Sequence, residues 1–229
     1  MTTRFAIIST QRSGTTMLKQ DLNMHPDVMC HGELYSVGSN SPVSYLRYRG
    51  GLPWRSPGGH LDFLFDKPET TAVGLKVMYN HLRLPGLNSA LSHRHVKLIH
   101  VVRENPLKVH VSYLTAKKRQ QFAATAPVEV MRVDCPIDGL LARLGESQRQ
   151  IERHRVWCTE AGGLELNYEA MRLDRAGEYR RLLAFLDVDE AVTMDAGTVK
   201  LNSDNLSEVI SNFEQVAAAL EGTPYARYL

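Results

Sequence analysis

The residues with the clearest chemistry stand near the start of the chain, in the run Arg12, Ser13, Gly14, Thr15 and Thr16. An apolar run, residues 5–9, precedes them, and a segment with helical spacing, residues 15–24, follows. A strand, a tight loop and a helix in this order turn backbone N–H groups inward, and the start of the helix adds about half a positive charge. The sequence therefore predicts an anion site on residues 12–16.

This loop differs from the loops that bind nucleoside triphosphates and dinucleotides. The triphosphate loop has the pattern GxxxxGK[ST], but Ser9 stands at the first glycine position and Thr15 at the lysine position. That lysine reaches the β- and γ-phosphates, so its absence disfavours a magnesium-dependent nucleotide kinase, which stays open as an alternative on the same fold. The dinucleotide pattern GxGxxG is absent as well.

A P-loop with a basic residue before Ser-Gly resembles that of the sulfotransferases that use 3′-phosphoadenosine 5′-phosphosulfate (PAPS). The resemblance implies that residues 12–16 hold the phosphosulfate and that Arg12 lies beside the transferring sulfuryl group. A second segment, residues 101–113, resembles the 3′-phosphate motif of the family, which places Arg103 and Ser112 on that phosphate. Arginine offers a planar fork of donors for such a phosphate. Ser112 follows Arg103 by nine residues, where many relatives have eight, and a surface ion pair of Arg103 with Glu104 is the alternative.

A third segment, residues 25–28 (HPDV) followed by Glu33, resembles tyrosylprotein and several carbohydrate sulfotransferases, in which this glutamate is the proposed general base. Sulfuryl transfer needs a base, because the acceptor hydroxyl loses a proton as its oxygen attacks sulfur. A structural ion pair of Glu33 with Arg12 or Lys76 is the alternative. His31 and His81 are the next candidates for the base, since cytosolic members of the family use a histidine.

Three further matches concern single side chains. Residues 74–78 resemble the Gly-x-Lys-x-Met strand of bacterial carbohydrate sulfotransferases, and a lysine inside an apolar strand is costly to bury unless it meets a negative charge. Lys76 is therefore expected beside a sulfuryl or phosphate oxygen, unless it reaches solvent from an edge strand. Tyr168 and Lys200 resemble tyrosylprotein sulfotransferase residues that contact the nucleotide, with core packing and a solvated lysine as their alternatives.

The elements that must position these groups alternate between strands and helices. Strands are expected at 5–9, 28–30, 71–79, 96–102 and 164–168, and helices at 15–24, 86–93, 106–119, 137–158, 175–186 and 206–220. This order predicts an α/β fold of the P-loop NTPase type, with a central parallel sheet between two helical layers. We expect one domain over residues 1–229, with residues 36–60 as a loop or lid on the acceptor side and a loop with a short helix over 120–136.

Composition sets the outer limits. The 229 residues are 43% hydrophobic with a net charge of +2, which is ordinary for a globular domain and gives no reason to expect nucleic acid as a partner. Three separated cysteines without a CxxC pair favour a reducing cytoplasm. The N-terminus shows no signal-peptide pattern, and no apolar run approaches the ~20 residues that span a bilayer.

The sequence thus predicts a sulfotransferase that moves a sulfuryl group from PAPS to an acceptor hydroxyl and releases adenosine 3′,5′-bisphosphate (PAP). Glu33 is the expected base, and Arg12 and Lys76 are expected to neutralise the developing charge without a metal. A carbohydrate or glycolipid acceptor is favoured, with a phenol or a protein tyrosine as alternatives. A non-enzymatic module that binds polyanions through the aromatic and basic residues 45–55 is a further alternative.

Overall fold

Five strands form one sheet in a computed structural model that describes residues 2–35, 56–120, 129–197 and 202–229. All neighbouring strands are parallel, and the order is β2-β3-β1-β4-β5. The strands are β1 (Thr3–Ser9), β2 (Val28–Glu33), β3 (Ala72–Met78), β4 (Lys97–Val102) and β5 (Leu164–Asn167). The predicted parallel α/β sheet is confirmed, and its central strand is the one that leads into the predicted anion loop.

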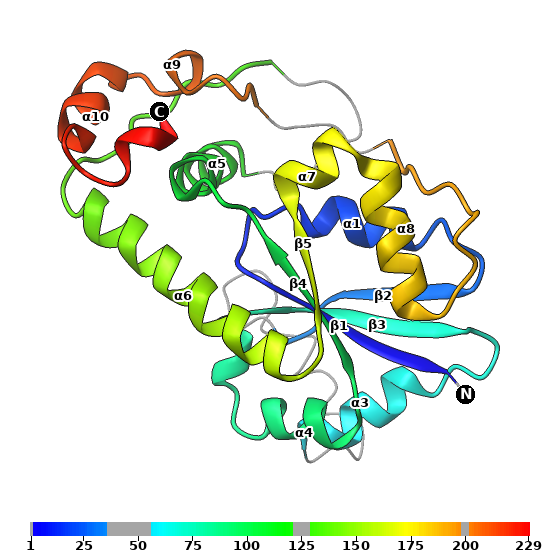
Figure 1. Cartoon of the computed structure of the whole chain (residues 1–229). Helices are drawn as coiled ribbons and strands as arrows, with labels where there is room; N and C mark the ends of the chain where they lie inside the picture. The colour runs from blue at the N-terminus through cyan, green and yellow to red at the C-terminus, as the bar shows by residue number, and fades with distance from the viewer. Residues whose placement is uncertain (1, 36–55, 121–128, 198–201) are drawn as a thin grey trace.

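Helices cover both faces of this sheet (Figure 1). One layer consists of α1 (Thr15–Leu22), α7 (Tyr168–Leu173) and α8 (Arg175–Leu186), and the other of α3 (Pro57–Phe65), α4 (Leu87–His93) and α6 (Leu140–Glu160). The period of two along β1 explains the two cores, because successive side chains point to opposite faces. Phe5 and Ile7 pack with the α1 layer, whereas Ala6 and Ile8 pack with the α3 layer.

A third apolar cluster lies beside the sheet, between α5 (Pro106–Arg119), the start of α6 and the C-terminal segment. That segment contains α9 (Leu206–Val209), α10 (Phe213–Leu220) and the short η2 (Ala226–Tyr228). The expected single helix over 206–220 is therefore wrong. The chain leaves the helix at Ile210, which forms a parallel β-bridge with Val133 inside the segment expected as a loop.

The predicted acceptor-side loop, residues 36–60, falls mostly outside the described residues. Its last part belongs to a helix, because α3 begins at Pro57. The Ser56 hydroxyl caps this helix by accepting from the Gly59 N–H at 3.3 Å. Proline at the first helical position fits as well, because its missing N–H has no partner there in any helix.

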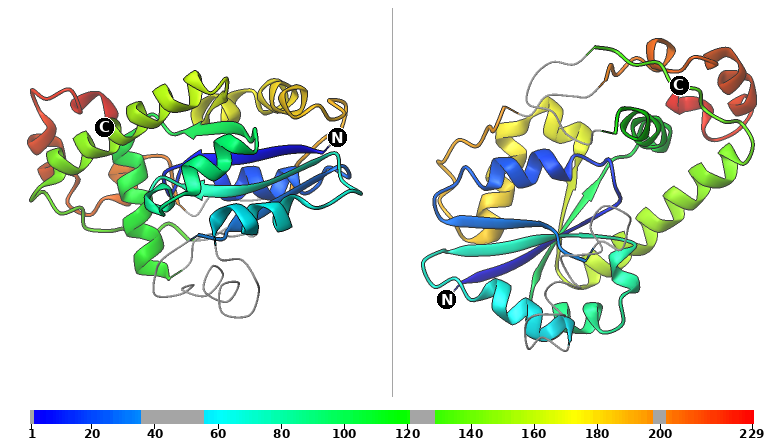
Figure 2. Two further views of the ribbon diagram at one scale, coloured as in Figure 1. Left: turned by 90° about the horizontal axis from the view of Figure 1, so that it is seen from below. Right: turned by 180° about the vertical axis from the view of Figure 1, so that it is seen from behind.

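The ends of β1 and β3 meet where the chain turns to opposite sides of the sheet. β1 continues into α1 on one face, whereas β3 continues through η1 (His81–Arg83) into α4 on the other face. Figure 2 shows this layering from below and from behind. In open parallel sheets, ligands bind beyond the carboxyl ends of the strands at such a switch point. The fold thus directs attention to the loop after β1.

Candidate active site

The loop between β1 and α1 ends in a helix start that no side chain caps. Gly14 occupies the N-cap position with φ +84°, and the first turn of α1 holds no acidic residue. The first N–H groups of a helix have no partner within it, so an uncapped start attracts an anion. The Ser13 hydroxyl is buried here without a hydrogen-bond partner among the described residues. The loop therefore offers donors that the rest of the described chain does not satisfy.

Two arginines converge on this loop. Arg12 has a left-handed backbone, φ +67°, and its Nε donates to the Ser112 hydroxyl on α5 at 3.1 Å. Arg103 follows β4, is 7% exposed, and donates from one terminal nitrogen to the Arg12 carbonyl at 3.3 Å. Its Nε is buried and has no partner among the described residues. The structure thus brings together Arg12, Arg103 and Ser112, which are far apart in the sequence.

The charge of one guanidinium group adds to the free-energy cost of burying the other. Burial lowers the pKa of Arg12, and the positive charge of Arg103 lowers it further. Burial also lowers the pKa of Arg103. Among the described residues, Arg103 takes part in no salt bridge. A buried cation beside another cation is expensive unless an anion compensates it, so this arrangement favours a bound phosphate or sulfate.

Tyr168 closes the same corner from the other side. It is the first residue of α7, and Asn167 caps that helix by accepting from the Ala170 N–H at 2.9 Å. The Arg103 guanidinium lies 4.7 Å from the centre of the Tyr168 ring, which is cation–π distance. A Cβ on Gly14 would lie 2.5 Å from this ring. Only glycine therefore allows the loop and the ring to approach so closely.

Lys76 and Glu33 form an ion pair next to the loop. Glu33 ends β2 after a register shift that sets it opposite Lys76 in β3. The Lys76 Nζ donates to Glu33 Oε1 at 3.1 Å and to the Thr16 hydroxyl at 3.2 Å. The lysine side chain is 6% exposed and the glutamate 31%. The positive charge of buried Lys76 is therefore paired with the Glu33 carboxylate, which is the ion pair given above as the alternative for Glu33. Of the two side chains, Glu33 is the more exposed.

The two histidines considered as bases are placed differently. His81 is buried, and its Nδ1 accepts from the Met78 N–H at 3.1 Å, so the neutral ring carries its proton on Nε2. Burial lowers the pKa of His31, and Lys67, which follows α3, lowers it further, while a bond to the Leu64 backbone raises it. His81 Nε2 is thus a buried donor without a partner among the described residues, and His31 is held on the α3 side of the sheet.

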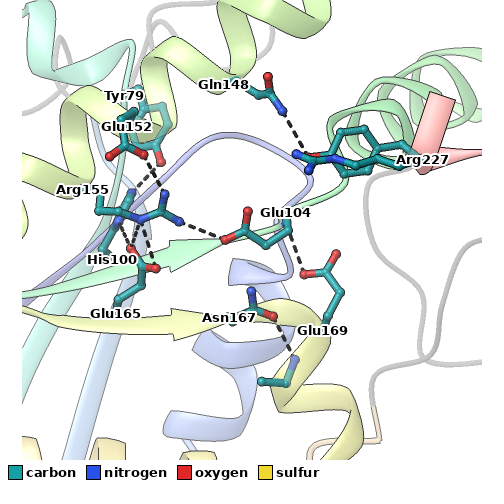
Figure 3. Close-up of polar contacts among 12 residues, drawn as sticks. Tyr79, His100, Glu104, Gln148, Glu152, Arg155, Glu165, Asn167, Glu169 and Arg227 are labelled. Atoms are coloured by element: carbon teal, nitrogen blue, oxygen red, sulfur yellow. Dashed lines mark hydrogen bonds and ion pairs between the residues drawn. The ribbon is translucent and has the colours of Figure 1, made fainter. Parts of the chain in front are cut away.

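Sequence reasoning missed a polar network on the α6 face of the sheet, which joins residues of β4, β5 and α6 to Tyr79 after β3 (Figure 3). The Tyr79 hydroxyl is 2.7 Å from His100 Nε2, and His100 Nδ1 is 3.0 Å from Glu165. Arg155 of α6 donates to Glu165 at 2.8 Å and to Glu104 at 2.9 Å. A signal existed, because His100 and Glu165 interrupt apolar strands and pair in register.

The predicted site residues with described positions gather around one corner of the sheet. Thr15 and Thr16 begin α1, Arg12 and Ser13 precede it, and the remaining groups come from β2, β3, β4, α5 and α7. Lys200 lies outside the described residues. Within residues 2–35, 56–120, 129–197 and 202–229, no group of three acidic, histidine or cysteine side chains is placed to hold a metal. In the same ranges, no helix is both long and apolar enough to cross a membrane.

The chain belongs to the sulfotransferase domain family, whose pattern matches residues 2–214. The fold is therefore that of a sulfotransferase domain enzyme.

Among curated proteins, nodulation protein H of Rhizobium meliloti is 24% identical over 241 aligned positions, which cover 98% of this chain and 94% of that protein. A sulfotransferase from Alicyclobacillus acidocaldarius superposes with a TM-score of 0.59 at 17% identity, over 100% of this chain and 99% of the other. A mouse sulfotransferase complexed with PAP gives a TM-score of 0.49 at 18% identity, over 82% and 59% of the two chains.

Proposed function

We propose that this chain transfers the sulfuryl group of PAPS to a hydroxyl group of a carbohydrate or glycolipid. The observation that carries the proposal is the pair of adjacent guanidinium groups, half-buried Arg12 and buried Arg103, at an uncapped helix start. PAPS bears two anionic ends, a phosphosulfate and a 3′-phosphate. The corner offers a matching set of unsatisfied donors for each, from the loop and from Arg103.

The donor would bind along the loop. The N–H groups of residues 13–16 and the Arg12 side chain would hold the phosphosulfate, while Arg103 and Ser112 would hold the 3′-phosphate. Tyr168, whose ring packs beside Gly14, and Lys200 would contact the nucleotide. Since Arg12 Nε donates to Ser112 in the described structure, the two anion positions share one hydrogen-bond network. Binding at one position would therefore help to order the other.

Glu33 would act as the base. The acceptor oxygen forms a bond to sulfur, the bond from sulfur to the phosphate oxygen breaks, and PAP leaves with that electron pair. Glu33 Oε1 accepts from Lys76, which leaves Oε2 for the proton of the acceptor. His81 is less suited, because its Nδ1 lone pair faces the Met78 N–H. Lys76 would stabilise the charge that develops on the transferring group.

A carbohydrate acceptor is proposed because the Gly74-Leu75-Lys76-Val77-Met78 strand resembles that of bacterial carbohydrate sulfotransferases. A cytoplasmic location is proposed as well, because Cys30, Cys135 and Cys158 are all buried free thiols.

The test is transfer of labelled sulfate from PAPS to a panel of glycans, phenols and peptides. Glu33→Gln is expected to lower turnover by about 10²–10⁴-fold, the usual contribution of a general base, while the affinity for PAP stays unchanged. Glu69→Gln, at an exposed position, is the matched control. Near-normal turnover in Glu33→Gln would remove Glu33 from its role. Phosphate transfer from ATP that a chelator abolishes, without sulfate transfer, would replace the whole proposal by a kinase.

A further inference from the structure

A cavity of about 270 Å³ lies beside Arg12. It is bounded by residues 10–12, by Tyr79 and Asn80 after β3, and by one face each of α5 and α6. Ligand sites have volumes of about 300–1,000 Å³, so this cavity suits one ring of a larger molecule. Arg12 belongs to the anion loop and also lines the cavity. A ring bound in the cavity would therefore lie next to the group that is transferred.

Several polar side chains around the cavity lack a protein partner. Gln11, Asn80 and Ser147 make no side-chain hydrogen bond among the described residues. The His110 Nε2 is buried, also without a partner in the described chain. These four groups come from four separate parts of the fold, namely the loop after β1, the segment after β3, α5 and α6, so their position around one cavity is not a feature of a single turn. Neutral donors and acceptors of this kind match the hydroxyl groups of a sugar.

Two tyrosine rings complete the walls. Tyr113 projects from α5 and is 41% exposed. Tyr79 is held on two sides, because its hydroxyl lies 2.7 Å from His100 and its ring stacks on His154 at 4.0 Å between centroids. Figure 3 shows how Glu165 and Arg155 support His100 in turn. Tyr79 thus forms a rigid part of the wall whose position is fixed before binding, and the exposed Tyr113 ring is the surface that suits the apolar face of a sugar ring.

The cavity is cationic. Besides Arg12, Arg143 of α6 borders it, and its described lining includes no aspartate or glutamate. Arg143 donates through one terminal nitrogen to the carbonyls of Pro136 and Asp138, which holds the side chain in place. Burial lowers the pKa of His110, and the positive charge of Arg143 lowers it further. His110 is thus kept neutral beside a fixed guanidinium.

We infer that this cavity binds the acceptor as an acidic sugar, whose ring lies against Tyr113 and whose carboxylate pairs with Arg143. The inference rests on the proposed function and narrows its acceptor from carbohydrates in general to uronic-acid rings. A carboxylate is favoured over a hydroxymethyl group at the same ring position, because only the charged group compensates the guanidinium.

The test uses the whole chain saturated with PAP and measures the binding of two sugars by saturation-transfer NMR. Methyl glucuronide and methyl glucoside share the ring and differ in a carboxylate or a hydroxymethyl group. The glucuronide is expected to bind about tenfold more tightly, the gain typical of one hydrogen bond to a charged group. Arg143→Gln is expected to remove this preference, and Arg143→Lys to retain most of it. His110→Phe is expected to weaken both sugars and to leave the preference intact.

Arg149→Gln is the matched control, because Arg149 lies on the same helix, is 67% exposed and pairs with Glu146. It is expected to behave like the wild type. Equal binding of the two sugars, or a preference that survives Arg143→Gln, would overturn the inference. PAP binding in the same samples distinguishes failure of the acceptor inference from failure of the proposed function. If PAP binds and neither sugar does, the acceptor inference is wrong and the proposed function stands. Failure to bind PAP contradicts the proposed function itself.

Discussion

The contact between Gly14 and Tyr168 allows a quantitative prediction for Gly14→Ala. Two separate costs arise. A left-handed backbone costs a non-glycine residue about 1–2 kcal/mol, and Gly14 has φ +84°. The new Cβ would also lie 2.5 Å from the Tyr168 ring, so the ring must move by about 1 Å to reach an ordinary contact. Overpacking of this kind typically costs about 1–3 kcal/mol. The free energy of unfolding should therefore fall by about 2–5 kcal/mol.

Gly86→Ala separates the two costs. Gly86 starts α4 with φ +82°, nearly the same backbone, but a Cβ there would meet nothing within 4 Å. Gly86→Ala should lower the free energy of unfolding by about 1–2 kcal/mol, the backbone cost alone. Urea unfolding gives both values. Calorimetric titration should show that Gly14→Ala lowers the affinity for PAP at least about tenfold, since displacing Tyr168 disturbs Arg103 and the loop donors. Gly86→Ala should leave the affinity for PAP unchanged. Equal destabilisation by the two substitutions, with normal PAP affinity, would refute this account of the loop.

Two further predictions concern stability. Burial lowers the pKa of His60 from its usual 6.5 to about 4, so the unfolded chain binds the proton first as the pH falls. Below pH 6.5 stability should decline, by about 2 kcal/mol from this residue at pH 5, and His60→Phe should flatten the curve from thermal unfolding at several pH values by that amount; an unchanged slope would contradict the assignment. Asp21 is fully buried and accepts from Arg175 and Tyr179 at 2.5 Å each. Asp21→Ala should lower the free energy of unfolding in urea by about 3–5 kcal/mol. Asp62→Ala, which removes the exposed partner of Arg94, should lower it by only about 0–1 kcal/mol. Similar losses for the two variants would contradict the role of Asp21.

Much of the site follows from local sequence. The apolar run before residues 12–16 predicts the strand that precedes the loop, because burial in a parallel sheet needs such a run. The helical spacing in residues 15–24 predicts the helix that follows the loop. An arginine at the end of the run 96–102 must lie at the same sheet edge as the loop, since parallel strands end together. Lys76 was expected to meet a negative charge because a lysine inside an apolar strand is costly to bury, and in the structure that charge is Glu33.

Other features depend on contacts between distant segments. The break after α9 arises because Ile210 pairs with Val133, and no local residue pattern specifies that bridge. The wall of the cavity is another example, because Tyr79 is fixed by His100 from a different strand. Along α6, Arg143, Ser147 and Gln150 do follow helical spacing. That spacing indicates one face of the helix, but only the fold shows that the face borders Arg12.

The proposed function requires Arg103 to bind the 3′-phosphate of the donor. The most direct measurement compares PAP with adenosine 5′-phosphate, which lacks only that phosphate, by calorimetric titration of the wild type and of Arg103→Gln. Arg181→Gln, at a 55% exposed position, is the control. PAP is expected to bind at least about tenfold more tightly than adenosine 5′-phosphate to the wild type and the control, and Arg103→Gln is expected to lose this difference. Equal affinity of the wild type for the two nucleotides would show that Arg103 does not bind the 3′-phosphate.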